Sequence, residues 1–213
     1  MLAHSLVPRF LAQVGSARWR VALRIDVEGP DSLIDRVRSR EIDAAIVQIE
    51  PFFSKEGLTQ ITLFEDKRAY YAGPRHPLAQ KESVSRRDIA KALHIIVGAP
   101  TQSQASGYVR FAEGLGEGLQ IELAGDVSIA LHLLATGNYI AALPQFVMEH
   151  LCDERQFVRL AYRGDMPSRI LSIWYKDDMA GQPLIKDFCS RLVKYVAELR
   201  AATPAEARIA DFS

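Results

Sequence analysis

The chain opens with a helical pattern of apolar residues. These residues recur at every fourth position and therefore share one stripe of a helix, at Leu2, Leu6, Phe10 and Val14. Pro8 falls within the stripe, and proline removes a helical hydrogen bond and crowds the preceding turn. The helix is therefore expected either to kink at Pro8 or to be regular on only one side of it.

The next residues predict a strand, a helix and a second strand. Gly29 and Pro30 end a period-two pattern typical of a strand, whose apolar positions are Val21, Leu23, Ile25 and Val27. Asp31 or Ser32 is expected to cap the following helix. Residues 43–49 read DAAIVQI, which indicates a buried strand.

The middle of the chain continues the alternation. Residues 61–73 predict two strand-like pieces, and Ser85 is expected to cap a short helix before a buried strand over 94–99. Further elements are predicted in the order helix, strand, helix and strand, over 107–115, 120–125, 128–136 and 156–160.

The stretch TGNYIAALP, residues 136–144, predicts a helix end followed at once by a strand. Gly137 can adopt the left-handed conformation that ends a helix, and Pro144 closes the apolar run. A strand over 169–176 and a final helix follow, with Pro183 in the first helical turn and an apolar stripe at Phe188, Leu192, Val196 and Leu199. This alternation predicts an α/β fold with mainly parallel sheets, whose ligands bind at the carboxyl ends of the strands.

Composition narrows the class of protein. The 213 residues are 48% hydrophobic and 24% charged, as in a globular protein, and two small lobes fit this length better than one large domain. Lys plus Arg equals Asp plus Glu at 26 each, so no net charge attracts nucleic acid or an anionic membrane. The sequence has neither an apolar run of about 20 residues nor a secretory signal pattern, and a soluble cytoplasmic protein without a membrane partner is expected.

Catalytic chemistry finds little support in the sequence. The chain has no GxSxG motif, its five histidines form no HxH or HxxxH pair, and its two cysteines, Cys152 and Cys189, suggest neither a zinc site nor a disulfide framework. We therefore expect no catalytic residue, metal or cofactor. The polar segment 100–107 follows a strand and precedes a helix, where exposed N–H groups can bind a carboxylate, although a plain connection fits the same spacing. Ser128 has a similar position, which helix capping would also explain.

The order of these motifs resembles that of the effector-binding domain of LysR-type transcriptional regulators. The matching segments span nearly the whole chain and read LVPRFLAQV, DSLIDRVRSREIDAAIV, YYAGPRHPLAQ, LLATGNYIAALP and LSIWYKDD. The resemblance implies a type 2 periplasmic-binding-protein-like fold, in which two Rossmann-like lobes are joined by two crossover strands. Lobe I would comprise residues 1–70 and 169–213, and lobe II residues 71–168. The hinge would contain Tyr70, Tyr71, Arg169 and Ile170.

The resemblance also implies ligand-binding residues. By position they are Met1, Leu2, Gln48, Thr101, Gln102, Ser103, Val127 and Ser128. The sequence departs from the family in two places. It begins with Met1 where the family has a preceding strand and a serine or threonine, so the chain is interpreted as truncated or as the product of a degenerate reading frame. Tyr139 stands where the family commonly has glycine, and it is expected to pack in the core rather than to narrow the cleft or stack on an aromatic ligand.

The function implied by the resemblance is effector sensing. A small molecule such as an organic or aromatic acid would bind between the lobes and change how attached DNA-binding domains hold a promoter. The implied partners are this effector, further copies in a homodimer or tetramer, and promoter DNA only through an N-terminal winged helix-turn-helix absent from the chain. A solute-binding protein of a transporter is the alternative, and an enzyme on the same scaffold would need a reactive cleft residue that the sequence does not identify.

Overall fold

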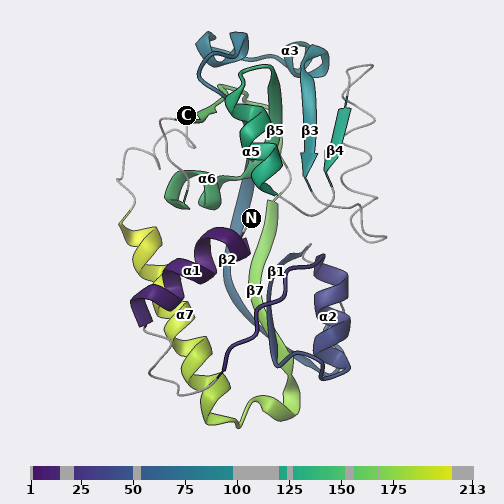
Figure 1. Cartoon of the computed structure of the whole chain (residues 1–213), viewed down its shortest axis with the longest axis vertical. Helices are drawn as coiled ribbons and strands as arrows, with labels where there is room; N and C mark the ends of the chain where they lie inside the picture. Colours follow the sequence, from purple (N-terminus) through teal and green to yellow (C-terminus); the bar gives the residue numbers. More distant parts are fainter. Residues whose placement is uncertain are drawn as a thin grey trace.

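Two groups of strands share the long strand β2 (Leu58–Ala72), which runs through the middle of the molecule (Figure 1). The computed structural model describes residues 2–14, 22–49, 54–97, 120–123, 127–151, 156–166 and 168–202. From Leu58 to Lys67, β2 pairs antiparallel with β7 (Ser168–Lys176). From Arg68 to Ala72 it pairs antiparallel with β5 (Tyr139–Pro144). Because β2 changes partner along its length, the strands that pair with its first part form one sheet, and those that pair with its last part form another. They are called the lower sheet and the upper sheet, after their positions in Figure 1.

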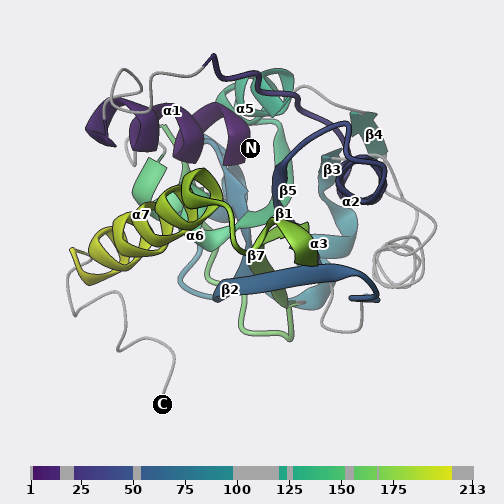
Figure 2. The same ribbon diagram turned by 90° about the horizontal axis from the view of Figure 1, so that it is seen from below.

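The lower sheet has helices on both faces. Its order is β1 (Ala44–Ile49), β7 and β2. Helix α2 (Pro30–Arg38) covers one face, and α1 (Leu2–Val14) and α7 (Pro183–Ala201) cover the other (Figure 2). The α2 side buries Ile34, Val37, Ala45, Val47 and Trp174. The α7 side buries Leu6, Phe10, Leu171, Ile173, Leu192 and Val196.

The upper sheet contains the end of β2 and four further strands. They are β5, β3 (Leu93–Val97), β4 (Gln120–Leu123) and the short β6 (Val158–Arg159). Strand β3 pairs parallel with both β4 and β5, whereas every pairing of β2 and β7 is antiparallel. The α/β class is as predicted, but the expectation of mainly parallel sheets is wrong, because the two long crossing strands impose antiparallel pairing on their neighbours.

Short helices complete the upper half and the ends of the sheets. They are η2 (Pro77–Gln80), α3 (Arg86–Lys91), α5 (Val127–Ala135) and η3 (Asp177–Met179). Helix α6 (Gln145–Leu151) follows β5 and joins two cores. Its Phe146 and Val147 pack in the cluster of α1 and α7, while Met148 packs with the residues of α5 and β5. The position of α6 therefore depends on both halves of the molecule.

Several local predictions are confirmed. Ser85 and Asp88 form a capping box at the start of α3, in which Ser85 Oγ accepts from the Asp88 amide and the Asp88 carboxylate accepts from the Ser85 amide. Gly137, two residues after the last residue of α5, has a φ of 82°. Pro183 occupies the first turn of α7. Pro8 lies inside α1, which continues as one helix on both sides of it, so the alternative of a helix regular on only one side of Pro8 is wrong.

The strand predicted from the alternation at Val21–Val27 is not formed. Residues 22–29 have no regular structure, and Leu23, Ile25 and Val27 are exposed. Asp26 and Glu28 instead form ion pairs with Arg36 of α2, so the acidic side chains of the segment turn toward α2, while Arg24 and the apolar side chains are exposed. A period-two pattern forms a strand only where a neighbouring strand supplies hydrogen bonds, and the described residues offer none to this segment.

Three element boundaries also differ from prediction. The two pieces predicted over 61–73 belong to the single strand β2, with a bulge between Thr62 and Phe64. Helix α2 begins at Pro30 with Gly29 in the capping position, in place of Asp31 or Ser32. Ser128 lies inside α5, which begins one residue earlier, so it is not the cap. The helix predicted over 107–115 lies outside the described residues.

The exposed segment leads to a first prediction. Replacing Ile25, which is 52% exposed, by alanine should change the free energy of unfolding by less than about 0.5 kcal/mol. The same change at the fully buried Ile173 should cost about 2–5 kcal/mol, because it leaves a cavity in the lower core. Urea unfolding of both variants gives the comparison, and equal losses would show that Ile25 is buried in solution.

A second prediction concerns the contact between the end of β2 and helix α5. A Cβ at Gly73 would lie 2.4 Å from the carbonyl oxygen of Leu134, so Gly73→Ala should force the two backbones apart and cost about 1–3 kcal/mol. Gly181→Ala is the matched control, because no atom lies within 4 Å of its added Cβ, and its effect should stay within about 0.5 kcal/mol. Similar unfolding midpoints for the two variants would contradict this packing.

Candidate functional site

The ends of strands from both sheets face each other across the middle of the molecule. The carboxyl ends of β3 and β4 and the start of α5 point down toward the lower sheet, while β1 ends at the top of that sheet (Figure 1). The start of α1 lies beside α5 in both ribbon views (Figures 1 and 2). The described strands and helices next to the predicted ligand loops therefore end in one region between the two halves.

The structure describes the side chains of only two predicted ligand residues. Gln48 is partly buried near the end of β1, and Ser128 is exposed in the first turn of α5. Leu2 and Val127 begin α1 and α5, with only their backbone described. The remaining predicted residues lie outside the described part of the chain, namely Met1, Thr101, Gln102 and Ser103.

A buried carboxylate, Asp66, lies where the two sheets meet. It is 5% exposed and sits on β2 just before the strand changes partner. Gln48 Nε2 of β1 donates to Asp66 Oδ2 at 2.8 Å, and the backbone amide of Phe146 in α6 donates to Oδ1 at 3.1 Å. One carboxylate thus connects the predicted ligand residue of the lower sheet to the first turn of the helix that follows the upper sheet.

The charges around Asp66 come from three elements. Arg68 follows two residues along β2 and therefore lies on the same face, and Arg169 of β7 is the direct cross-strand partner of Asp66. Arg68 Nη1 donates to the carbonyl of Ala142 in β5 at 3.2 Å. Glu149 of α6 adds a second negative charge. The crossover, where the strands pass from one sheet to the other, therefore carries charged side chains between two apolar cores.

Burial raises the pKa of Asp66 to about 6 from its ordinary value of 3.8. The hydrogen bonds from Phe146 and Gln48 and the charge of Arg68 oppose this effect, whereas the charge of Glu149 adds to it. A carboxyl group whose burial disfavours the charged form lowers the stability of the fold when it ionises near neutral pH. Such groups are concentrated at functional sites, which marks Asp66 as part of a candidate site.

The predicted hinge residues lie on both sides of the change of partner in β2. Tyr70 and Tyr71 pair with Ala142 and Ala141 of β5 in the upper sheet. Arg169 and Ile170 pair with Asp66 and Glu65 in the lower sheet. The strands cross between the halves at Lys67 and Arg68 of β2 and at the start of β7, next to Arg169. These four positions therefore remain candidates for a hinge.

Cys189, His76 and His94 are buried and have structural environments. Burial raises the pKa of the Cys189 thiol to about 11, so this thiol is protonated near neutral pH. Burial lowers the pKa of His76 and of His94, which favours their neutral forms. His76 Nδ1 accepts from the Leu78 amide, and His94 Nε2 donates to the Ile89 carbonyl at 2.7 Å. Cys152 lies outside the described residues.

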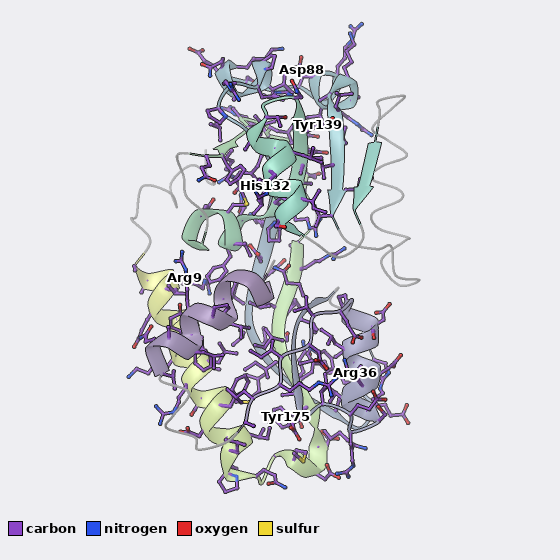
Figure 3. The ribbon with its side chains drawn as sticks, in the orientation of Figure 1. Arg9, Arg36, Asp88, His132, Tyr139 and Tyr175 are labelled. Atoms are coloured by element: carbon purple, nitrogen blue, oxygen red, sulfur yellow. The ribbon has the colours of Figure 1, made fainter. Side chains whose placement is uncertain are left out.

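The described residues contain neither a metal-binding cluster nor a membrane-spanning helix. Among them, no three His, Cys, Asp or Glu side chains gather where a metal ion could bind. None of the helices formed by this part of the chain combines the length and apolar character needed to cross a bilayer. Tyr139 is partly buried against the upper core, as expected, and lies in the upper half of the molecule away from the crossover (Figure 3).

Sequence reasoning missed Asp66. It belongs to the charged run Glu65–Arg68, and such a run usually indicates a solvated surface. The signal that could have found it is the alternation from Phe64 to Tyr70, which places Asp66 and Arg68 on the same strand face as two buried aromatic residues. Its two hydrogen-bond donors come from distant parts of the chain, which no local pattern reveals.

Comparison with known proteins supports this description. The family model for the LysR substrate binding domain matches residues 1–197. No curated protein matches the sequence of the chain. The regulatory domain of CcmR from Synechocystis PCC6803, solved in complex with 2-PG, is similar in structure, with a TM-score of 0.71 and 15% identity over 90% of this chain and 91% of that one.

Two further regulatory domains have a similar fold. Reduced OxyR from Pseudomonas aeruginosa gives a TM-score of 0.68 at 18% identity, over 93% of this chain and 91% of that one. MetR from N. meningitidis, a LysR family regulator, gives a TM-score of 0.57 at 19% identity, over 76% and 73%. These structures support the two-lobed, periplasmic-binding-protein-like fold expected from the sequence.

The buried carboxyl group predicts a pH dependence of stability. The pKa of Asp66 is higher in the folded chain than its ordinary value, so its contribution is fully present below pH 3.8 and is lost as the pH rises through about 6. The free energy of unfolding of the wild type, minus that of Asp66→Asn, should therefore fall by roughly 3 kcal/mol across this window. Urea unfolding at several pH values measures the difference, and a constant or rising difference would contradict the assignment.

Proposed function

This chain belongs to the LysR substrate binding domain family, and we propose that it senses a small carboxylate held between its two lobes. The family assignment confirms the prediction made from the order of the sequence motifs. It also favours a regulatory domain over the alternative, a solute-binding protein of a transporter. The observation that carries the proposal is the arrangement of the end of β1, which contains Gln48, the start of α5 and the crossover strands around one region (Figure 1).

The proposed lobes have the boundaries expected from the sequence. Lobe I comprises residues 1–70 and 169–213, and lobe II residues 71–168. The change of partner in β2 between Lys67 and Arg68, three residues before the proposed boundary, supports a division in this part of β2. Closure of the lobes would bend the molecule at the crossing strands, close to the proposed hinge residues Tyr70, Tyr71, Arg169 and Ile170.

A carboxylate suits the donors that surround the proposed site. Gln48 has a second amide hydrogen beyond the one given to Asp66, and the first turn of α5 directs backbone N–H groups and the positive end of the helix dipole toward the same region. The polar segment Thr101–Ser103 is included in the proposed site on the basis of its sequence position alone. The related CcmR domain was solved with 2-PG, which gives one starting compound for a search.

Binding without chemical conversion is part of the same proposal. The protonated thiol of Cys189 and the structural roles of His76 and His94 support it, because they leave these groups unsuited to nucleophilic or acid-base catalysis. We propose that the chain acts in the cytoplasm as part of a homodimer or tetramer. It would reach promoter DNA only through a winged helix-turn-helix domain outside this chain.

A ligand screen tests the function. Titration calorimetry with acetate, succinate, benzoate and 2-PG should identify at least one compound that binds the wild type. Gln48→Ala should weaken its binding roughly tenfold or more, because a hydrogen bond to a charged group is lost. Gln60→Ala is the control, since Gln60 lies in the same sheet but donates to Ser172 Oγ at 2.8 Å, and it should leave the affinity unchanged. Binding that survives Gln48→Ala would exclude the proposed site.

A further inference from the structure

We propose that Asp66 is a positioning residue that couples the effector site at Gln48 to helix α6. The inference rests on the proposed function only in taking Gln48 as an effector contact. Asp66 itself is almost completely buried and both of its oxygens accept hydrogen bonds, so it acts through its neighbours rather than by touching the effector.

The geometry makes Asp66 the shared acceptor of two distant elements. Gln48 and Phe146 each donate to a different oxygen of the same carboxylate. A change in the charge of the carboxyl group therefore alters both contacts together. A carboxylate at the first turn of a helix also stabilises that helix through its dipole and its unpaired amides. The ionised form of Asp66 thus holds the start of α6.

Helix α6 is well placed to pass on such a change. The Phe146 ring lies 4.5 Å from the ring of Phe64, centroid to centroid, in the core shared with α1 and α7. Met148, on the other side of the helix, packs in the core of the upper sheet. A weaker contact at the Phe146 amide would therefore alter packing in both lobes.

The charges that face Asp66 determine the direction of the coupling. Arg68 on β2 and Arg169 on β7 are positive, whereas Glu149 on α6 is negative. Arg200 of α7 lies 5.0 Å from the centroid of the Phe64 ring, two residues along β2. β1 supplies the neutral amide of Gln48, and β5 supplies the Ala142 carbonyl to Arg68.

An anionic effector at Gln48 would oppose the charge of Asp66. It would accept the second amide hydrogen of Gln48 and bring a negative charge close to the carboxylate, which favours the protonated form of Asp66. A neutral carboxyl group is a weaker acceptor for the Phe146 amide than a carboxylate. Occupation of the site would thereby release the first turn of α6, and binding would be accompanied by proton uptake.

The coupling can be tested without an effector by NMR titration of the full chain. The amide resonance of Phe146 should shift with pH, with a midpoint near the pKa of Asp66, about 6, and Asp66→Asn should abolish this shift. Gln48→Leu should move the midpoint to higher pH, because the carboxylate loses a donor. Glu149→Gln should move it to lower pH, because a like charge is removed. These opposite shifts distinguish coupling from a general loss of structure.

Gln60→Leu is the matched control, because it removes the same type of side chain from the same sheet without touching Asp66, and the midpoint should stay unchanged. The proposal is overturned if Phe146 does not titrate or if Gln48→Leu leaves the midpoint where it was. Gln48→Leu and Glu149→Gln decide the question even if Asp66→Asn does not fold. Because no ligand is added, failure here is distinct from failure of the carboxylate screen.

Discussion

The hydrogen bonding of strand β2 determines the arrangement of the whole chain. A strand has two edges, and β2 pairs with β7 over its first part and with β5 over the remainder. Each part builds its own sheet, with its own helices and core. The two sheets are consequently joined by continuous backbone, and helix α6 packs against the cores of both. Two bodies connected in this way can change their relative orientation by small rotations in a few residues, which is the property that a sensing domain requires.

The same constraint explains why polar groups gather at the crossover. Where the pairing partner changes, β2 carries Asp66 and Arg68 between the buried Phe64 and Tyr70. These two side chains form hydrogen bonds to Gln48, Phe146 and Ala142, which belong to three different elements. Buried polar groups contribute specificity when their partners are all present, at some expense of stability. The crossover therefore fixes how the halves meet, while the raised pKa of Asp66 keeps that arrangement sensitive to added charge.

Much of the fold could be predicted because its signals are local. Gly137 ends α5 through its own backbone conformation, and Ser85 caps α3 through a residue three positions away. The order of such motifs was sufficient to identify the family. Strand pairing and burial depend on distant residues, so the sequence predicted the wrong predominant strand direction and an unformed strand at Val21–Val27. For the same reason it could suggest Gln48 as a ligand residue from a family position, but it did not suggest Asp66, whose partners come together only in the folded chain.

The segment before α2 has a consequence for the behaviour of the protein in solution. The ion pairs of Arg36 with Asp26 and Glu28 hold this segment in an orientation that exposes Leu23, Ile25 and Val27 as an apolar surface. Added salt acts on this apolar surface in two opposing ways. It screens the pairs with Arg36, which frees the segment to rotate, and at high concentration it strengthens contacts between apolar surfaces of separate molecules. Colloidal stability should therefore depend on ionic strength in a non-monotonic way, although the chain carries no net charge.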